Sequence, residues 1–87
     1  MAVKVYNMSF LKGLPAAVEA DVSGMSVLSA IEHLESEYGA EIKSTMLTGG
    51  KLAEGYRILL NGSSVHEMDS LVPDGSQLMF TFVVVGG

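Results

Sequence analysis

The residues with the clearest chemical potential stand at the end of the sequence, where the apolar run Phe80–Val85 is followed directly by Gly86 and Gly87. No second element follows these glycines, so they serve no turn between elements. Because glycine has no Cβ, a narrow channel of another protein can close around its backbone. The reactive group there would be the carboxylate of Gly87, a poor electrophile because its charge is spread over two oxygens. We therefore expect any chemistry at Gly87 to require prior activation of the carboxylate.

The same two glycines are also typical of a flexible end with no role, because chain termini are commonly disordered. Gly86 and Gly87 alone therefore do not decide the function. The elements that position them must be considered first.

Composition indicates one domain over residues 1–87, with a tail over residues 83–87. Hydrophobic residues make up 48% of the sequence and charged residues 17%, which is enough for one modest core and is atypical of a disordered chain. The formal net charge is −5. This charge argues against binding to nucleic acid or to an anionic membrane surface, and it suits a partner with a basic groove.

The sequence contains no cysteine, which excludes a disulfide framework, a thiolate nucleophile and a cysteine-based zinc site. Its first residues lack the long apolar stretch of a signal peptide. No apolar run approaches the ~20 residues of a transmembrane helix. We expect a cytoplasmic protein.

Two strands are predicted at the start of the sequence. Residues 3–8 are rich in β-branched and aromatic residues, residues 9–15 form a turn region with Gly13 and Pro15, and residues 16–22 alternate between apolar and acidic residues. The apolar face of the second strand comprises Val18, Ala20 and Val22. The two strands should pair as an antiparallel hairpin.

A helix follows, because the apolar spacing changes from two residues to three and four. Its apolar face comprises Val27, Ile31, Leu34 and Tyr38, with Ala30 beside them. Ser26 is expected to cap the N-terminus of this helix. Gly39 stands where a left-handed residue ends a helix.

The rest of the sequence, from residue 40 onward, predicts mainly strands. Residues 40–55 are irregular, with a short helical turn around Ile42, Met46 and Leu47 and a break at the two glycines 49 and 50. A strand over residues 56–62 ends in Asn-Gly, a strong hairpin signal, and residues 63–68 form a very short return strand. Residues 71–75 form a turn, and residues 76–85 form the last strand.

This element order predicts an α+β fold, a mixed sheet with one main helix packed across one face. A hairpin, a crossing helix and a strand that returns beside the first strand make the β-grasp arrangement. In that arrangement the first and last strands lie parallel at the centre of the sheet.

Alternation along the last strand then assigns its side chains to two faces. Leu78 and Phe80 should share the helix-facing side with Val3 and Val5. Met79 and Thr81 should face outward, beside Tyr6 and either Ile58 or Leu59. An apolar patch on the outer face of a sheet is a docking surface for a partner, and scattered apolar surface is the alternative.

Three dipeptides carry a resemblance to a known family. Asn61-Gly62 closes a strand, Asp74-Gly75 forms a turn and Gly86-Gly87 follows the last strand. This ordered set resembles the ubiquitin-like sulfur carriers, which include the small subunit of molybdopterin synthase and the sulfur carrier of thiamine biosynthesis. The resemblance covers the whole chain in element order. The sequence departs from the molybdopterin type at Phe82-Val83, where that type usually has two prolines.

The resemblance implies a sulfur carrier. An E1-like adenylyltransferase would use ATP to adenylate the Gly87 carboxylate, and a sulfur donor enzyme would convert it to a thiocarboxylate. The carried sulfur would serve cofactor biosynthesis, with the molybdopterin type favoured over thiamine by chain length, and a synthase large subunit would be a further partner. The reacting residues would be Gly87 with Gly86. The residues expected to contact partners are Met79, Thr81, Phe82, Val83, Val84 and Val85.

Two other functions fit the same tail. The chain could be a protein modifier joined through Gly87 to lysines, or a plain β-grasp binding module. It shows no Ser-His-Asp spacing and no carboxylate pair for catalysis of its own. We therefore expect it to act as a carrier or small subunit, with no permanently bound cofactor and with ATP used by the activating partner.

The two histidines, His33 and His66, are candidates for further sites. His33 and Glu37 are separated by one helical turn, but two ligands do not make a metal site, and a solvated helix face is the simpler interpretation. His66, close to Glu67 and Asp69, is expected in a surface loop. The sequence predicts no metal site.

Overall fold

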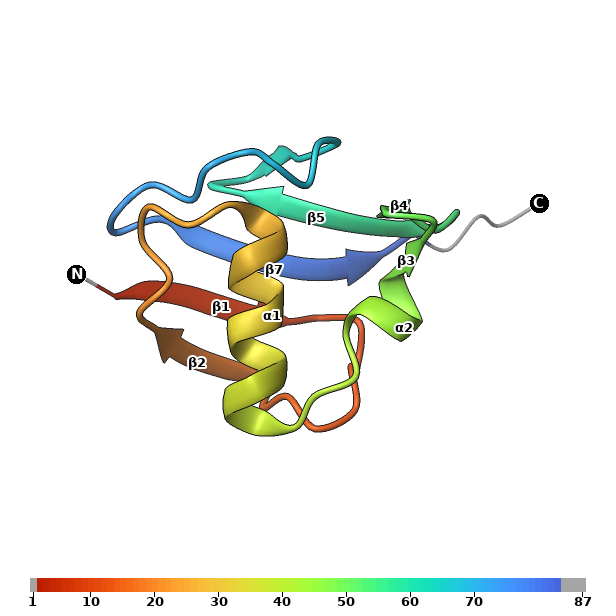
Figure 1. Ribbon diagram of the computed structural model, residues 1–87, viewed down its shortest axis with the longest axis horizontal. Helices are drawn as coiled ribbons and strands as arrows, with labels where there is room; N and C mark the ends of the chain where they lie inside the picture. Colours follow the sequence, from red (N-terminus) through yellow and green to blue (C-terminus); the bar gives the residue numbers. More distant parts are fainter. Residues whose placement is uncertain (1, 84–87) are drawn as a thin grey trace.

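The computed structural model describes residues 2–83, and its main feature is a five-stranded mixed sheet (Figure 1). In spatial order the strands are β2 (Ala17–Ala20), β1 (Val3–Asn7), β7 (Gln77–Phe82), β5 (Tyr56–Leu60) and β6 (Ser63–Ser64). The remaining elements are the helices α1 (Val27–Tyr38) and α2 (Lys43–Met46) and a small hairpin of β3 (Leu47–Thr48) and β4 (Lys51–Leu52).

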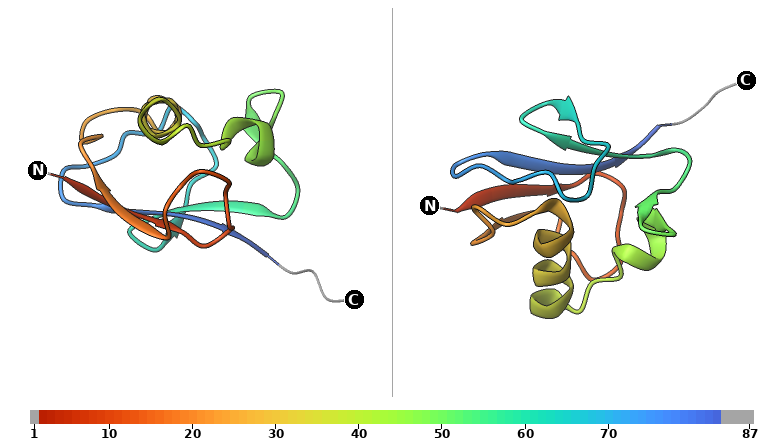
Figure 2. Two further views of the ribbon diagram at one scale, coloured as in Figure 1. Left: turned by 90° about the horizontal axis from the view of Figure 1, so that it is seen from below. Right: turned by 45° about the horizontal axis from the view of Figure 1, so that its top comes forward.

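The first and last strands lie side by side at the centre of this sheet. β1 runs parallel to β7, with Val5 in register with Leu78, and β7 pairs antiparallel with β5, with Phe80 opposite Ile58. Both helices lie on one side of the sheet (Figure 2). The predicted α+β fold, a β-grasp arrangement with one main helix across one face, is confirmed.

α1 begins and ends at the predicted residues because both of its ends are capped. Ser26 has an extended backbone, and its hydroxyl oxygen accepts a hydrogen bond of 3.1 Å from the amide of Ser29. Gly39 ends the helix with a φ of 66°, and its amide donates to the carbonyl of Glu35.

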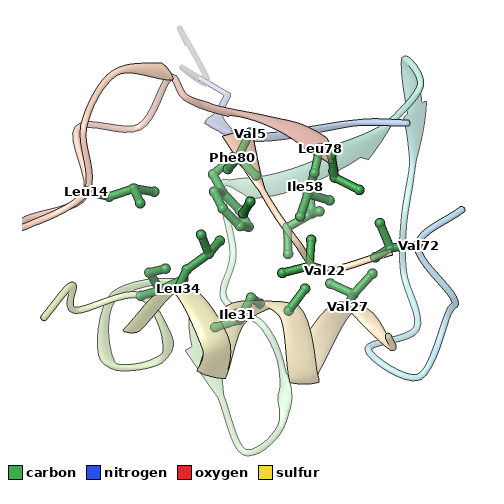
Figure 3. Packing of buried hydrophobic residues seen from close by; sticks show 14 of the residues in the cluster. Val5, Leu14, Val22, Val27, Ile31, Leu34, Ile58, Val72, Leu78 and Phe80 are labelled. Carbon is green, nitrogen blue, oxygen red and sulfur yellow. The ribbon is translucent and has the colours of Figure 1, made fainter. Parts of the chain in front are cut away.

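The apolar face of α1 packs against the inner face of the sheet (Figure 3). Ile31 and Leu34 are completely buried, and so are Leu78 and Phe80 of β7. The predicted helix face and the predicted inner face of β7 are therefore confirmed. Burial of such aliphatic side chains contributes ~1.5–3 kcal/mol each to the free energy of folding, so this layer dominates the stability of the domain.

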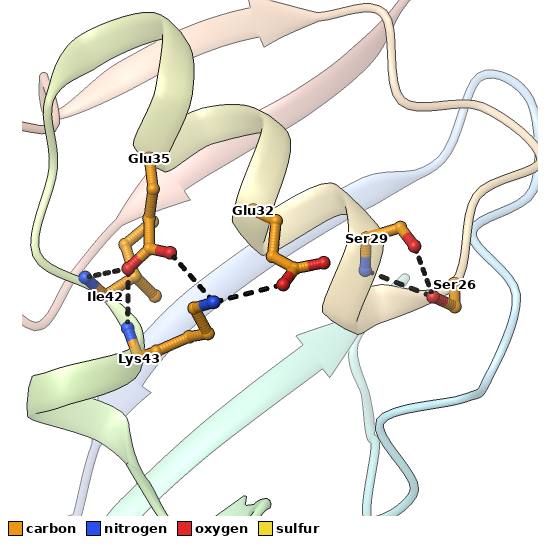
Figure 4. Close-up of polar contacts among 6 residues, drawn as sticks. All are labelled: Ser26, Ser29, Glu32, Glu35, Ile42 and Lys43. Atoms are coloured by element: carbon orange, nitrogen blue, oxygen red, sulfur yellow. Dashed lines mark hydrogen bonds and ion pairs between the residues drawn. The ribbon is translucent and has the colours of Figure 1, made fainter.

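Glu35 fixes α2 against α1 (Figure 4). One of its carboxylate oxygens accepts hydrogen bonds from the amides of Ile42 and Lys43, at 3.1 and 3.0 Å. The Lys43 ammonium lies 3.0 Å from Glu32 and 3.7 Å from Glu35. The hydrogen bond to Glu32 raises the pKa of Lys43, so the ammonium group remains charged at neutral pH.

Replacing Glu35 should therefore destabilise the protein, because its carboxylate is the acceptor for two backbone amides at the start of α2. Glu35→Ala leaves the two amides at the start of α2 without their acceptor, and we expect a loss of ~1–2 kcal/mol in the free energy of unfolding, as for a helix cap. Chemical denaturation measures this loss. Glu32→Ala is the control, because it removes only an exposed ion pair worth ~0–1 kcal/mol. Equal losses for the two variants would contradict the capping role.

Each of the five strands of the sheet is shorter than the predicted range, and the ends of β2 and β7 show why. β2 ends at Ala20 and not at Val22, because Ala20 pairs with Val3, the first residue of β1, and no partner remains beyond it. β7 ends at Phe82, with Val83 outside the strand, and residues 84 and 85 of the predicted strand lie outside the described residues. The neighbours of β7 stop at Phe82, since Phe82 pairs with Tyr56, the first residue of β5.

The segment predicted as irregular contains one element that was missed. β3 and β4 form a hairpin across Gly49 and Gly50, whose φ angles are 59° and 82°. Two glycines with positive φ form the tight turn that this hairpin needs. None of the helices in residues 2–83 is both long and apolar enough to cross a membrane.

Candidate functional site

Only some of the predicted partner-contacting residues lie within residues 2–83, the part of the chain that the structure describes. Met79, Thr81 and Phe82 belong to β7, and Val83 follows it outside any strand. The other four predicted site residues, Val84, Val85, Gly86 and Gly87, lie outside the described residues.

The outer face of the sheet carries a row of partly exposed apolar side chains. Met79 and Thr81 alternate with the buried Leu78 and Phe80, so they face away from the helices. Met79 lies in register with Tyr6 on one side and Leu59 on the other. The choice between Ile58 and Leu59 is thereby decided for Leu59, because Ile58 is completely buried on the helix side. We call Tyr6, Leu59, Met79 and Thr81 the outer row.

Both neighbouring segments hold the end of β7. The amide of Met8 donates to the carbonyl of Phe80 at 2.7 Å, and the amide of Val83 donates to the carbonyl of Gly55 at 2.7 Å. The backbone is thus hydrogen-bonded as far as Val83. The direction in which the chain leaves the sheet is fixed by these bonds.

A second apolar group flanks this exit, and sequence reasoning missed it. Phe10 lies in the loop between β1 and β2 with 85% of its surface exposed. Its ring centroid is 6.3 Å from that of Phe82, with the rings tilted by 50°. A large apolar residue in a turn region, within "SFLKG", was the available signal.

The backbone of Phe10 is unusual as well. Its φ angle is 57°, in the left-handed region that is an outlier for a bulky residue and costs ~1–3 kcal/mol. Such a conformation persists only where the surrounding structure enforces it.

The buried side chain of Asn7 helps to enforce it. Its amide nitrogen donates to the carbonyls of Leu11 and Leu14, at 3.1 and 2.8 Å, and its oxygen accepts from the amide of Leu11 at 2.9 Å. Leu11 and Leu14 are themselves buried in the core. The loop is therefore closed on both sides of Phe10.

The part of the loop that follows Phe10 contacts the turn after α1. A Cβ on Gly13, whose φ is 89°, would lie 2.9 Å from the Cα of Ala40, so only glycine fits this approach. The carbonyl of Lys12 also accepts a hydrogen bond of 3.0 Å from the amide of Glu41. Phe10 is presented by a loop that is fixed at three points.

The histidines show no sign of a catalytic or metal site. His33 Nε2 lies 3.1 Å from a carboxylate oxygen of Glu37, as their helical spacing suggested. His66 is exposed and lines, with Tyr56 and Arg57, a shallow hollow of about 180 Å³. Within the described part of the chain, no group of three or more potential ligands could hold a metal ion.

Comparison with known proteins identifies the architecture. No family model and no curated protein matches the sequence. The crystal structure of the BexX/CysO complex from Amycolatopsis orientalis contains a chain that is 26% identical with a TM-score of 0.80, covering 99% of this chain and 100% of that one. This chain is ubiquitin-like. Its resemblance to the ubiquitin-like sulfur carriers, inferred from the three dipeptides, is confirmed over its whole length.

Two further solved structures share the ubiquitin-like fold of this chain. SAMP1 from Haloferax volcanii is 20% identical with a TM-score of 0.74 and full coverage of both chains. Urm1 from Trypanosoma brucei is 21% identical with a TM-score of 0.70, covering 99% of the ubiquitin-like chain and 95% of Urm1. The first of the three structures was solved as a complex with a second protein, BexX.

Proposed function

We propose that this chain is a sulfur carrier that acts through the carboxylate of Gly87. An E1-like adenylyltransferase would activate the carboxylate, a sulfur donor enzyme would convert it to a thiocarboxylate, and a synthase large subunit would receive it. The sulfur would serve cofactor biosynthesis in the cytoplasm, of the molybdopterin type in preference to thiamine. The observation that carries this proposal is the central position of β7, which is hydrogen-bonded on the β1 side as far as Phe80 and on the β5 side as far as Val83, four positions before Gly87.

The chemistry asks little of the carrier itself. A Gly87 carboxylate oxygen attacks the α-phosphorus of ATP in the partner's site and pyrophosphate leaves. A hydrosulfide-level nucleophile from the donor enzyme then attacks the carbonyl carbon, and AMP leaves with the bonding electron pair. The carrier supplies the carboxylate and its orientation, and ATP is used by the partner. This division of labour requires the carrier to provide a binding surface for the partner and no catalytic group of its own.

The outer row is the surface proposed for partner contact near the tail. Its side chains are apolar or uncharged, partly exposed and held by a rigid sheet. Met79 and Thr81 lie on the strand that leads to the tail, so a partner that encloses Gly87 can reach them from the same side. Apolar groups gathered on a sheet face are typical of a protein interface.

Intact-mass analysis of the protein purified from its own host tests the function. Replacement of one oxygen by sulfur at Gly87 supports the carrier. Gly87 in an isopeptide bond to a lysine of another protein would support a modifier and overturn the carrier. The matched control lacks Gly86 and Gly87 and should stay unmodified. If the wild-type chain is unmodified and no adenylating enzyme of the host activates it, the carrier and the modifier are both refuted. A β-grasp binding module is then the remaining function.

A further inference from the structure

Phe10, Phe82 and Val83 form an apolar surface, which we call the stem patch, around the point where the chain leaves β7. Their exposed fractions are 85%, 40% and 41%. Phe10 stays largely exposed although its ring lies close to that of Phe82. The stem patch is therefore apolar surface exposed to solvent.

This patch is separate from the outer row. Phe82 has the same strand parity as Leu78 and Phe80, whose side chains point to the helix side, whereas Met79 and Thr81 point to the other side. Phe82 is less buried than Phe80 because it lies at the end of the strand. The exit of the chain is thus flanked by apolar side chains on both faces of the sheet.

The contacts that fix the loop around Phe10 also keep its side chain exposed. Asn7, Gly13 and the bond between Lys12 and Glu41 fix the loop, and they hold Phe10 at a φ that bulky residues avoid. Strain of this kind clusters at ligand-binding and active sites. A rigid aromatic side chain also loses little conformational entropy when a partner covers it, which is typical of the residues that dominate an interface.

The length of the tail indicates which protein covers the stem patch. This inference rests on the proposed function. Gly87 lies four positions after Val83, and four residues span at most about 14 Å. A protein that encloses Gly87 must therefore lie within that distance of Val83, next to the stem patch. We propose that the stem patch is covered by the enzyme that adenylates Gly87, with Phe10 inserted into an apolar pocket of that enzyme.

Phe10→Asn separates binding from folding. Asparagine tolerates a positive φ far better than phenylalanine, so the melting temperature should be unchanged or higher. The ring that binds the enzyme is lost. In ATP–pyrophosphate exchange with the adenylating enzyme of the same organism, we expect the carrier concentration for half-maximal rate to rise about thirtyfold, as for an interface residue of the dominant kind. Phe10→Tyr should keep most of the affinity.

The matched control is Leu71→Asn. Leu71 is 67% exposed and pairs with Ser26 in the segment that precedes Gln77, the first residue of β7, whereas Phe82 is the last residue of β7. Leu71→Asn should leave the half-maximal concentration unchanged. If Phe10→Asn and Leu71→Asn have equal half-maximal concentrations, the enzyme does not bind the stem patch. The proposed carrier function would not be affected by that result.

Two other results would also count against the proposal. If the wild-type chain supports no exchange, the carrier function itself falls, and the proposed occupant falls with it. If sedimentation shows that wild type is a dimer and Phe10→Asn a monomer, with unchanged exchange kinetics, the stem patch binds a second copy of the chain and not the enzyme.

Discussion

Gly87→Ala is expected to slow adenylation by roughly ten- to a hundredfold, because small misplacements of a reacting group have effects of that size. The substitution places a methyl group beside the carboxylate that must enter the partner's ATP site. If the channel closes tightly around two glycines, the added Cβ displaces the carboxylate from the position of attack. Gly86→Ala should act in the same way, and more strongly if Gly86 takes a positive φ when bound.

The measurement is ATP–pyrophosphate exchange with the host's adenylating enzyme, combined with thermal unfolding of each variant. Folding should be unaffected, because the buried core of the described residues lies between Val3 and Phe80. Deleting both glycines should abolish exchange and sets the baseline. Wild-type rates from Gly87→Ala would refute the narrow channel and the role given to the two glycines.

Ile31→Ala should have the largest effect on stability, a loss of ~2–5 kcal/mol in the free energy of unfolding. Ile31 is completely buried at the middle of the apolar face of α1, between the helix and the sheet. Truncation removes buried methyl and methylene groups and leaves a cavity that close-packed neighbours fill only in part. A domain of this size has a total stability of about 5–15 kcal/mol, so the variant would be close to unfolding.

Leu28→Ala is the control in the same helix. Leu28 stands on the solvent side with 36% of its surface exposed, and its truncation should cost no more than ~0.5–1 kcal/mol. Urea denaturation followed by circular dichroism gives both values. A cost below ~0.5 kcal/mol for Ile31→Ala would mean that the helix packs through another face.

The features that the sequence predicted well depend on neighbours along the chain. The bounds of α1 follow from Ser26, Gly39 and the apolar spacing between them, all within one helix length. The turn at Asn61-Gly62 also depends only on its own two residues, with φ angles of 52° and 83°. Such local signals can be read without knowing what the element packs against.

The features that were missed depend on contacts between distant residues. β7 ends at Phe82 because β1 and β5 have no further residues to pair with, which the apolar run up to Val85 does not reveal. The exposure of Phe10 depends on the bonds that Asn7 makes across the loop and on the approach of Gly13 to Ala40. The sequence places Phe10 in a turn region, but it does not show that the ring lies close to Phe82 at the end of β7, so the stem patch as a whole could not have been predicted.

The central position of β7 also determines when the protein can fold. β1 and β5 both pair with β7, so the middle of the sheet is completed by the strand that is synthesised last. Until Gln77–Phe82 is available, β1 and β5 each have an open edge, and an open edge is prone to pair with other chains. Pairing between the two ends of the chain also gives a high contact order, which slows folding. Pairing of β7 therefore closes the two edges at which the unfinished sheet would be prone to aggregate.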